Sequence, residues 1–167
     1  MNEAFEFAIY SVPIGAGATV VVDLWILGLK RFLGISSASW GMVGRWIGHM
    51  PEGRFVHESI SKAAPIPHEK AIGWITHYAI GIGFAGILLA ILGVAWARQP
   101  TLLPALCFGW VTVAAPFFLL QPGLGMGIAA AKTPKPMIAR LRSLISHTVF
   151  GFGLYLTASL LAMIGRL

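Results

Sequence analysis

The chain has 167 residues, of which 57% are hydrophobic and only 11% are charged, and its formal net charge is +6. A mean hydropathy of +0.79 would expose more apolar surface to water than a soluble domain tolerates, so this composition excludes most soluble folds. Apolar stretches longer than about 18 residues predict membrane-spanning helices. Four occur, at 7–29, 71–97, 101–121 and 143–165, and they predict an all-α polytopic membrane protein whose residues 1–167 form a single four-helix domain.

The first predicted span has the charge pattern of a membrane anchor and not that of a cleavable signal peptide. Glu3 and Glu6 precede the apolar core, where a signal peptide carries positive charge. Lys30-Arg31 follow it without a small-residue cleavage pattern. The span therefore stays in the membrane, and it carries Asp23 with it. Cys107, inside the third span, is the one cysteine of the sequence, so no disulfide framework exists.

Residues 34–69 are the long polar segment of the chain, and we predict a cytoplasmic loop with a short interfacial helix. In "SWGMVGRWIGHM" an apolar stripe at helical spacing suits a helix that lies in the membrane interface. The stripe consists of Trp40, Val43, Ile47 and Met50, and the opposite side consists largely of Gly41, Arg45, Gly48 and His49. The prolines and the glycine of "MPEGRFVHES" and "APIPHEK" then indicate turns and extended chain.

The third predicted span contains residues that interrupt a regular helix. The connection before it, "ARQPT", is minimal, so the second and third spans form a tight hairpin. Pro116 and Pro122 each remove a backbone hydrogen bond, and "QPGLGMG" follows. In a bilayer such backbone persists only where protein or water satisfies the freed groups. We therefore expect "LLQPGLGMG" to border the bundle interior or a cytoplasmic vestibule.

A match between the second and fourth spans predicts an internal repeat. Without gaps, "KAIGWITHYAIGIGF" (70–84) aligns with "RLRSLISHTVFGFGL" (140–154). The matched positions include Lys70 with Arg140, Gly73 with Ser143, His77 with His147, Gly81 with Gly151 and Gly83 with Gly153. The first and third spans agree more weakly, through "TVVVD" and "TVAAP". The pattern predicts two repeated two-helix units related by an axis along the membrane normal, although helix-packing pressure could produce part of the similarity.

The glycines of the second span also match a nucleotide-binding fingerprint, Gly-x-Gly-x-x-Gly at Gly81, Gly83 and Gly86. That fingerprint requires a strand, a turn and a helix N-terminus, with an acidic residue about 20 residues further on. Here the glycines lie in one apolar helix, and no acidic residue follows Gly86. Glycines in membrane helices more often allow close helix approach. The sequence therefore predicts no nucleotide and, because it lacks a suitable basic patch, no nucleic-acid partner.

The basic residues predict the orientation in the membrane. Most of them lie between the first and second spans or between the third and fourth spans, and only Arg98 and Arg166 fall elsewhere. With four spans these two loops share one side, which the positive-inside rule makes the cytoplasm. Both termini then face outward. We expect a multi-pass protein with a lipid bilayer as its surroundings.

Three ionisable residues on three spans have a similar predicted depth. His77 and His147 each lie seven residues beyond a basic residue, and Asp23 lies seven residues before Lys30. Seven residues correspond to about 10 Å of helix. The three side chains thus share the cytoplasmic third of the membrane as a candidate ligand or proton site, which Gln121 could join. Gly81 and Gly151 lie one turn from the histidines and leave space for a helix, a water file or a flat cofactor.

Several functions are compatible with this candidate site. The histidines could simply hydrogen-bond between helices in a structural or accessory subunit. His77, His147 and Asp23 could ligate a transition metal, or the two histidines a haem. The site could also pass or bind a proton, an ion or a small solute, and a homo-oligomer or larger complex would widen the path. An enzyme is least supported. His49, His57-Glu58 and His68-Glu69 could form a catalytic or metal constellation, but they lack His-Glu-x-x-His spacing and are more often ordinary loop residues.

Five stretches carry a family resemblance that covers nearly the whole chain: "GATVVVDLW", "VGRWIGHMPEGRFVHESI", "HEKAIGWITHYAIGIGF", "PTLLPALCFGWVTVAAPFFLLQPGLGMGIAAAKTP" and "RLRSLISHTVFGFGLYL". In them the chain resembles a family of short bacterial inner-membrane proteins, catalogued as a domain of unknown function, number twenty-nine thirty-eight. The resemblance implies a four-span protein of the bacterial inner membrane, and it implies no activity, cofactor or catalytic residue.

Overall fold

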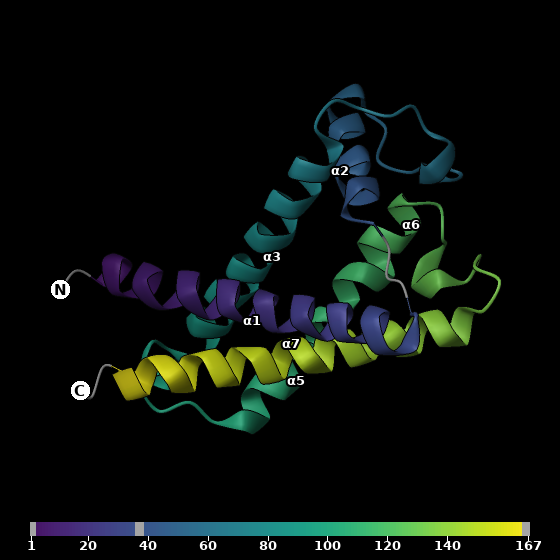
Figure 1. Cartoon of the computed structure of the whole chain (residues 1–167). Coiled ribbons are helices and arrows are strands. Elements are labelled where there is room, and N and C mark those ends of the chain that lie inside the picture. The colour runs from purple at the N-terminus through teal and green to yellow at the C-terminus, as the bar shows by residue number, and fades with distance from the viewer. Residues whose placement is uncertain (1–2, 36–38, 165–167) are drawn as a thin grey trace. The chain divides into compact units, whose positions relative to one another are not determined.

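The computed structural model describes residues 3–35 and 39–164, and its regular structure is helical throughout this part of the chain. Four segments are long and apolar enough to cross a membrane: α1 (Glu3–Leu33), α3 (Glu69–Leu92), Leu102–Gly123 and α7 (Pro136–Ile164). Figure 1 shows these elements in order. The prediction of an all-α protein with four membrane-spanning helices is confirmed at this level. Gly165, the last residue of the predicted fourth span, the basic residue Arg166 after it and residues 36–38 of the predicted loop lie outside the described residues.

The bounds of the spans differ from the predicted ones by one to seven residues, and two boundaries differ by five or more. The second helix ends at Leu92 and not at Ala97, because Gly93 adopts a left-handed conformation, with φ 79°, that terminates the helix. Its N–H donates to the Leu89 carbonyl, and a separate short helix, α4 (Ala95–Arg98), follows. The fourth helix begins at Pro136, ahead of the predicted start at 143, since proline is well suited to the first position of a helix.

The third membrane-spanning segment is irregular, as its prolines predict. α5 (Leu102–Thr112) is followed by a π-helical turn, η3 (Pro116–Leu120), and then by the short α6 (Gln121–Gly123). Proline at the start of η3 and again in α6 cannot donate to the preceding turn. A wider turn of this kind is rare and occurs mostly as a single turn inserted in an α-helix.

The chain divides into two compact units, and α3 and α7 contribute to both. The first unit combines residues within 1–35, 78–111 and 146–167, and the second combines residues within 36–77 and 112–145. Large apolar side chains are exposed along the long helices, for example Leu24 and Ile91 of the first unit. Side chains of this kind suit a lipid bilayer, so the apolar helices belong to a multi-pass membrane protein.

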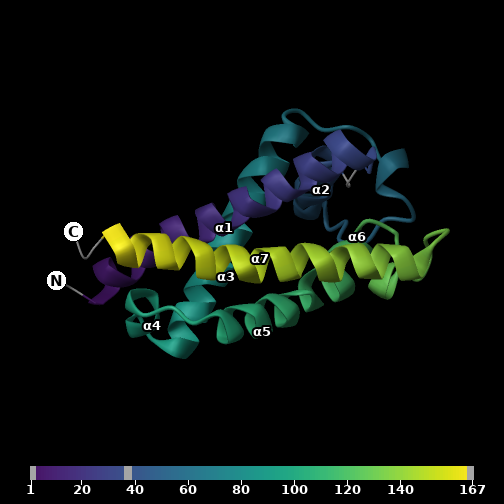
Figure 2. The same cartoon turned by 60° about the horizontal axis from the view of Figure 1, so that its bottom comes forward.

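Small residues hold the helices of the first unit close together. α1 and α7 lie side by side in both views, with the start of α1 and the end of α7 at the same end of the unit (Figures 1 and 2). The α1–α7 contact is made at Gly153, where an added Cβ would come within 2.9 Å of the Ala18 Cα. Ile14, Leu88 and Leu154 fill the core beside it. At the same end Arg98 forms an ion pair with Glu6.

The second unit packs the short helix α2 (Trp40–His49) against the start of α3. Ser39 caps α2 by accepting a hydrogen bond from the Gly41 N–H. Gly44 of α2 and Gly73 of α3 meet so closely that a Cβ on either would overlap a backbone carbonyl of the other helix. The short 3₁₀ helices of this unit are η1 (Met50–Glu52), η2 (Ile60–Lys62) and η4 (Ile128–Ala130).

The polar side of α2 faces protein and not solvent. Arg45, with 14% of its side chain exposed, donates from Nε and Nη2 to the two Glu69 carboxylate oxygens at 2.8 and 3.0 Å. It also donates to the carbonyls of Ile60 and Ala63. Gly41 and His49, on the same side of the helix, are buried too. An apolar stripe alone therefore does not identify which face of α2 the protein covers.

Candidate functional site

The four residues that the sequence singles out as a ligand or proton site divide between the two units. Asp23 and His147 belong to the first unit, and His77 and Gln121 belong to the second. Each residue is therefore described by its neighbours within its own unit.

Asp23 is hydrogen-bonded to a tyrosine of the next span. The Tyr78 hydroxyl donates to Asp23 Oδ2 at 3.0 Å, and both side chains are partly buried. Asp23 lies in α1, ten residues before the helix ends at Leu33. Tyr78 lies in α3, beyond the first turns of that helix. The pair thus places a carboxyl group and a phenol between two apolar helices, where ionisable residues are costly and commonly functional.

His147 connects α7 to α5 in the first unit. Its imidazole donates a hydrogen bond to the backbone carbonyl of Gly109, and its ring centre lies 6.5 Å from that of Phe150. One residue further along α7, Thr148 accepts a hydrogen bond from the Trp110 indole at 3.0 Å. Bonds of this kind between membrane helices contribute about 0.6–2 kcal/mol each. His147 therefore has at least one interhelical structural contact.

His77 lies in an aromatic cluster of the second unit. Its ring stacks on Trp40 with centroids 3.8 Å apart and an interplanar angle of 23°, and Trp74 approaches its edge at 5.8 Å. Trp40 is the first residue of α2, and His77 belongs to α3. The stack therefore joins α2 to α3, close to the contact of Gly44 with Gly73.

Gln121 is the most buried of the four predicted residues, with 6% of its surface exposed. Its Nε2 donates to the Ser143 hydroxyl at 3.1 Å, whereas its Oε1 is buried without a hydrogen-bond partner. The backbone around it is held by the Met126 N–H, which donates to the Gln121 carbonyl at 2.8 Å. The break in the third span thus brings a polar amide into the second unit and leaves one of its acceptors unsatisfied.

The space predicted beside Gly81 and Gly151 is filled by helices. A Cβ at Gly81 would overlap the Thr19 hydroxyl of α1, and a Cβ at Gly151 would meet the backbone of Ala105 in α5 at 2.7 Å. Each glycine therefore brings two helix backbones together. Of the helix, the water file and the flat cofactor that the sequence leaves open beside these glycines, the structure places a helix at both positions.

Comparison with known families adds one result to this geometry. Residues 12–161 match the model of a family described as "Protein of unknown function (DUF2938)". The chain belongs to this family. No curated protein and no solved structure matches it. Membership agrees with the resemblance noted in the sequence, and the family's description assigns no activity.

The metal-site prediction for this family member is not supported by its side-chain arrangement. Over residues 3–35 and 39–164, no group of three or more His, Cys, Asp or Glu side chains is placed to hold a metal ion. Asp23, His77 and His147 all lie within that part of the chain. The neighbours that the structure gives to Asp23 and His77 are instead Tyr78 and Trp40.

Two histidines of the polar loop lie together in this protein, His49 and His57, which the sequence offered as part of a catalytic or metal constellation or, more commonly, as ordinary loop residues. The ring centres of His49 and His57 are 5.2 Å apart at an angle of 64°. His49 Nδ1 and His57 Nε2 are both buried without a hydrogen-bond partner. Burial first, then His49 and Arg54, lower the pKa of His57 below its ordinary value. The spacing of eight residues gave no signal, because the chain reverses between them.

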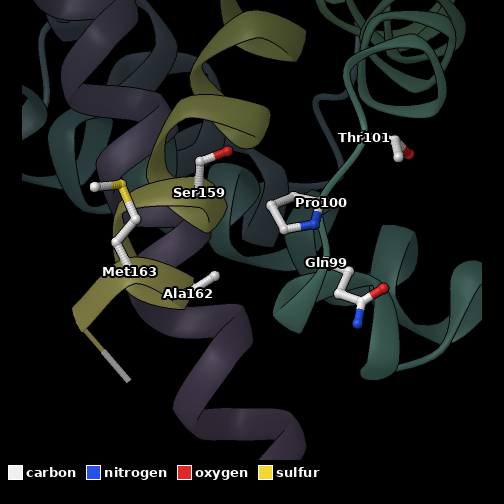
Figure 3. Close-up of a pocket in the computed structure, with 6 residues that line it drawn as sticks. All are labelled: Gln99, Pro100, Thr101, Ser159, Ala162 and Met163. Carbon is white, nitrogen blue, oxygen red and sulfur yellow. The ribbon is translucent and has the colours of Figure 1, made fainter. Parts of the chain in front are cut away.

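Two open pockets lie in the first unit. One, of about 440 Å³, is bounded by three residues before α5 and three from the last turns of α7: Gln99, Pro100, Thr101, Ser159, Ala162 and Met163 (Figure 3). None of these six is charged. The other, of about 500 Å³, includes Glu6 and Arg98, whose ion pair it borders. Neither pocket is lined by Asp23, His77, His147 or Gln121.

Proposed function

We propose that this protein binds and transfers protons through the hydrogen-bonded pair of Asp23 and Tyr78 within its membrane-spanning helices. The observation that carries the proposal is the 3.0 Å hydrogen bond from the Tyr78 hydroxyl to Asp23 Oδ2. A carboxyl group can accept and release a proton, and a phenol can pass one along a hydrogen-bonded chain. Acidic residues in membrane spans serve as proton relays in pumps and transporters.

The composition of the pair favours a proton over a metal cation. Mg²⁺ and Ca²⁺ require about six to eight oxygen ligands, several of them carboxylate or carbonyl groups. Asp23 and Tyr78 supply three side-chain oxygens between them, and the Tyr78 hydroxyl already donates to one of the two Asp23 oxygens. Among the described residues, Asp23 belongs to no group of three or more His, Cys, Asp or Glu side chains that could hold a metal ion. A proton needs one acceptor, which Asp23 provides.

Substitution of Asp23 tests this function. In proteoliposomes with an imposed pH gradient, Asp23→Asn should abolish proton flux, because the amide has the shape of the carboxyl group and cannot take up a proton at neutral pH. Tyr78→Phe should reduce the flux by about 10- to 100-fold, because the carboxyl group remains but loses the Tyr78 hydroxyl. This reduction corresponds to a rise of about 1.4–2.8 kcal/mol in the activation free energy of transfer. A pH-sensitive dye inside the vesicles measures the rate.

Glu58→Gln is the matched control, because Glu58 is an exposed carboxylate outside the membrane-spanning segments. It should leave the flux unchanged. Equal fluxes for the parent protein, Asp23→Asn and empty vesicles would refute the proton-transfer proposal.

A structural role is the second candidate, and the hydrogen bond from His147 to the Gly109 carbonyl favours it. In that account polar side chains only join helices, and the protein acts as an accessory subunit. The same vesicles decide between the two functions. Variants that unfold at lower temperature without any change in proton flux would support the structural account, whereas a loss of flux in stably folded Asp23→Asn would support transfer.

The orientation proposed for this protein follows the basic residues and the repeat together. We place residues 34–69 and 124–135 on the cytoplasmic side of a bacterial inner membrane and both termini on the outer side. In a repeat with an axis along the membrane normal, these two loops share one side. The repeat is supported by equivalent glycines, since Gly81 packs against α1 and Gly151 packs against α5.

Cysteine labelling tests the orientation and this kind of repeat in one experiment. In a Cys107→Ala background, cysteines at the exposed positions Ser61 and Ala131 should react with a membrane-impermeant maleimide only after the cytoplasmic side is opened. A cysteine at Gln99 should react in intact cells with a permeable outer membrane. If Ser61 and Ala131 label from opposite sides, the parallel repeat is wrong.

A further inference from the structure

The chain reverses directly after α2 and brings two histidines together. η1 (Met50–Glu52) follows His49, and Gly53 then takes a left-handed conformation with φ 77°. Residues that carry a Cβ rarely adopt this conformation, so glycine suits the position. The Arg54 N–H then donates to the His49 carbonyl at 3.3 Å. The His57 N–H donates to the Gly123 carbonyl at 3.0 Å, which fixes the segment of the loop that returns towards His49. As a result the two imidazole rings have centres 5.2 Å apart.

The hydrogen bonds of His49 determine which of its nitrogens carries a lone pair. Only 3% of His49 is exposed, and its Nε2 lies 3.0 Å from the Ala64 carbonyl oxygen. A carbonyl only accepts, so Nε2 carries the hydrogen and Nδ1 presents a lone pair. That Nδ1 is buried without a partner, and so is Nε2 of His57. Buried polar nitrogens are rarely left unsatisfied, and a bound ligand would satisfy both.

We propose that His49 and His57 form a binding site for one transition-metal ion, held by His49 Nδ1 and His57 Nε2. Imidazole nitrogens bind copper, zinc and related ions through such lone pairs, while their other nitrogen donates to a carbonyl or carboxylate. The Ala64 carbonyl supplies this orienting contact for His49. The site is separate from the proton pair and would stand if the proposed function failed.

The surroundings of the two rings favour Cu(I) over Zn²⁺. No third His, Cys, Asp or Glu side chain in the described part of the chain joins them in a metal-binding group, so the protein supplies two nitrogen ligands. Cu(I) is satisfied by two ligands, whereas Zn²⁺ takes four. A single positive charge is also less costly to bury than a double charge.

Metal titration of the full-length protein in detergent tests the site. The protein, purified with a tag that contains no histidine, is titrated anaerobically with Cu(I) in competition with a chromophoric chelator, and separately with Zn²⁺. We expect one Cu(I) per chain, bound at least about tenfold more tightly than Zn²⁺. X-ray absorption at the copper edge should show nitrogen neighbours.

The variants are chosen to keep the fold. His49→Gln retains an amide donor for the Ala64 carbonyl and removes the ring nitrogen, and His57→Ala removes the second ligand. Each should weaken Cu(I) binding by more than the roughly 10- to 100-fold that loss of an outer-shell partner costs. His68→Asn is the control, because His68 is exposed and asparagine tolerates its φ of 58°.

Three results would overturn the proposal. Binding to His49→Gln and His57→Ala that equals binding to the parent would place the metal elsewhere. A parent protein that binds no more Cu(I) than a variant with both His49→Gln and His57→Ala would leave the pair without a metal role. Tighter binding of Zn²⁺ than of Cu(I) would overturn the choice of ion.

Discussion

Replacing Gly73 by alanine is expected to lower the free energy of unfolding by about 1–3 kcal/mol or more. The reason is steric: an added Cβ would overlap the Trp40 carbonyl oxygen, which is backbone and cannot rotate away. Gly44→Ala should have a similar effect, because its Cβ would overlap the Glu69 carbonyl. To accommodate either methyl group, α2 must move away from α3. Thermal unfolding in detergent measures the change, and amide exchange in α2 should rise with it.

Gly83→Ala is the control for this prediction, because it lies on the same helix and its Cβ would meet nothing within 4 Å. It should be neutral or stabilise the helix by up to about 1 kcal/mol, since alanine has the higher helix propensity. The double variant Gly44→Ala/Gly73→Ala should cost less than the sum of the single variants, because one displacement of α2 relieves both overlaps. Equal stability of Gly73→Ala and Gly83→Ala would show that the α2–α3 contact is not as close as described.

Replacing Arg45 by lysine should cost about 2 kcal/mol, between the values typical of exposed and buried ion pairs. Lysine keeps the charge and loses the planar fork that reaches both Glu69 oxygens and the carbonyls of Ile60 and Ala63. In the parent protein, the hydrogen bond with Glu69 raises the pKa of Arg45 above its ordinary value. Because Arg45 holds three segments of the second unit, the loss should loosen residues 60–69 as well as α2.

A double-mutant cycle measures the part of this effect that belongs to the ion pair. Arg45→Met and Glu69→Gln are made singly and together, and the coupling energy is obtained from their unfolding free energies. We expect a coupling of about 1–2 kcal/mol that changes little between low and high salt, since the side chains are only 14% and 22% exposed. Arg54→Lys is the surface control, because the Arg54–Glu52 pair is mostly exposed. A coupling near zero would mean that the carbonyl contacts alone account for the role of Arg45.

The membrane spans could be predicted because they depend on local properties of the chain. Length and apolarity are sufficient to identify four spanning helices, and Pro116 and Pro122 are sufficient to interrupt the third. The end of α3 was missed by five residues because Gly93 has two common roles in such helices. It can pack against another helix or terminate its own, and only its left-handed φ distinguishes them.

The candidate site was harder to predict, because its chemistry depends on partners far away in sequence. The sequence singled out Asp23 by its charge in an apolar helix, but not its partner Tyr78, which lies 55 residues later. It grouped His49 and His57 with His68 as a possible constellation but could not show which of the three lie together. It also read Arg45 and His49 as the side of α2 away from the interface, whereas both are covered by protein.

By itself the sequence determined an all-α protein with four membrane-spanning helices, because apolar length and proline positions act within a single helix. The tertiary structure decided which polar atoms are satisfied. It gave Asp23 a phenol donor, filled the space at Gly81 and Gly151 with neighbouring helices, and left His49 Nδ1 and His57 Nε2 buried without partners. The physical reason is that desolvation and hydrogen bonding depend on which segments meet in space, and residue spacing along one helix does not encode that.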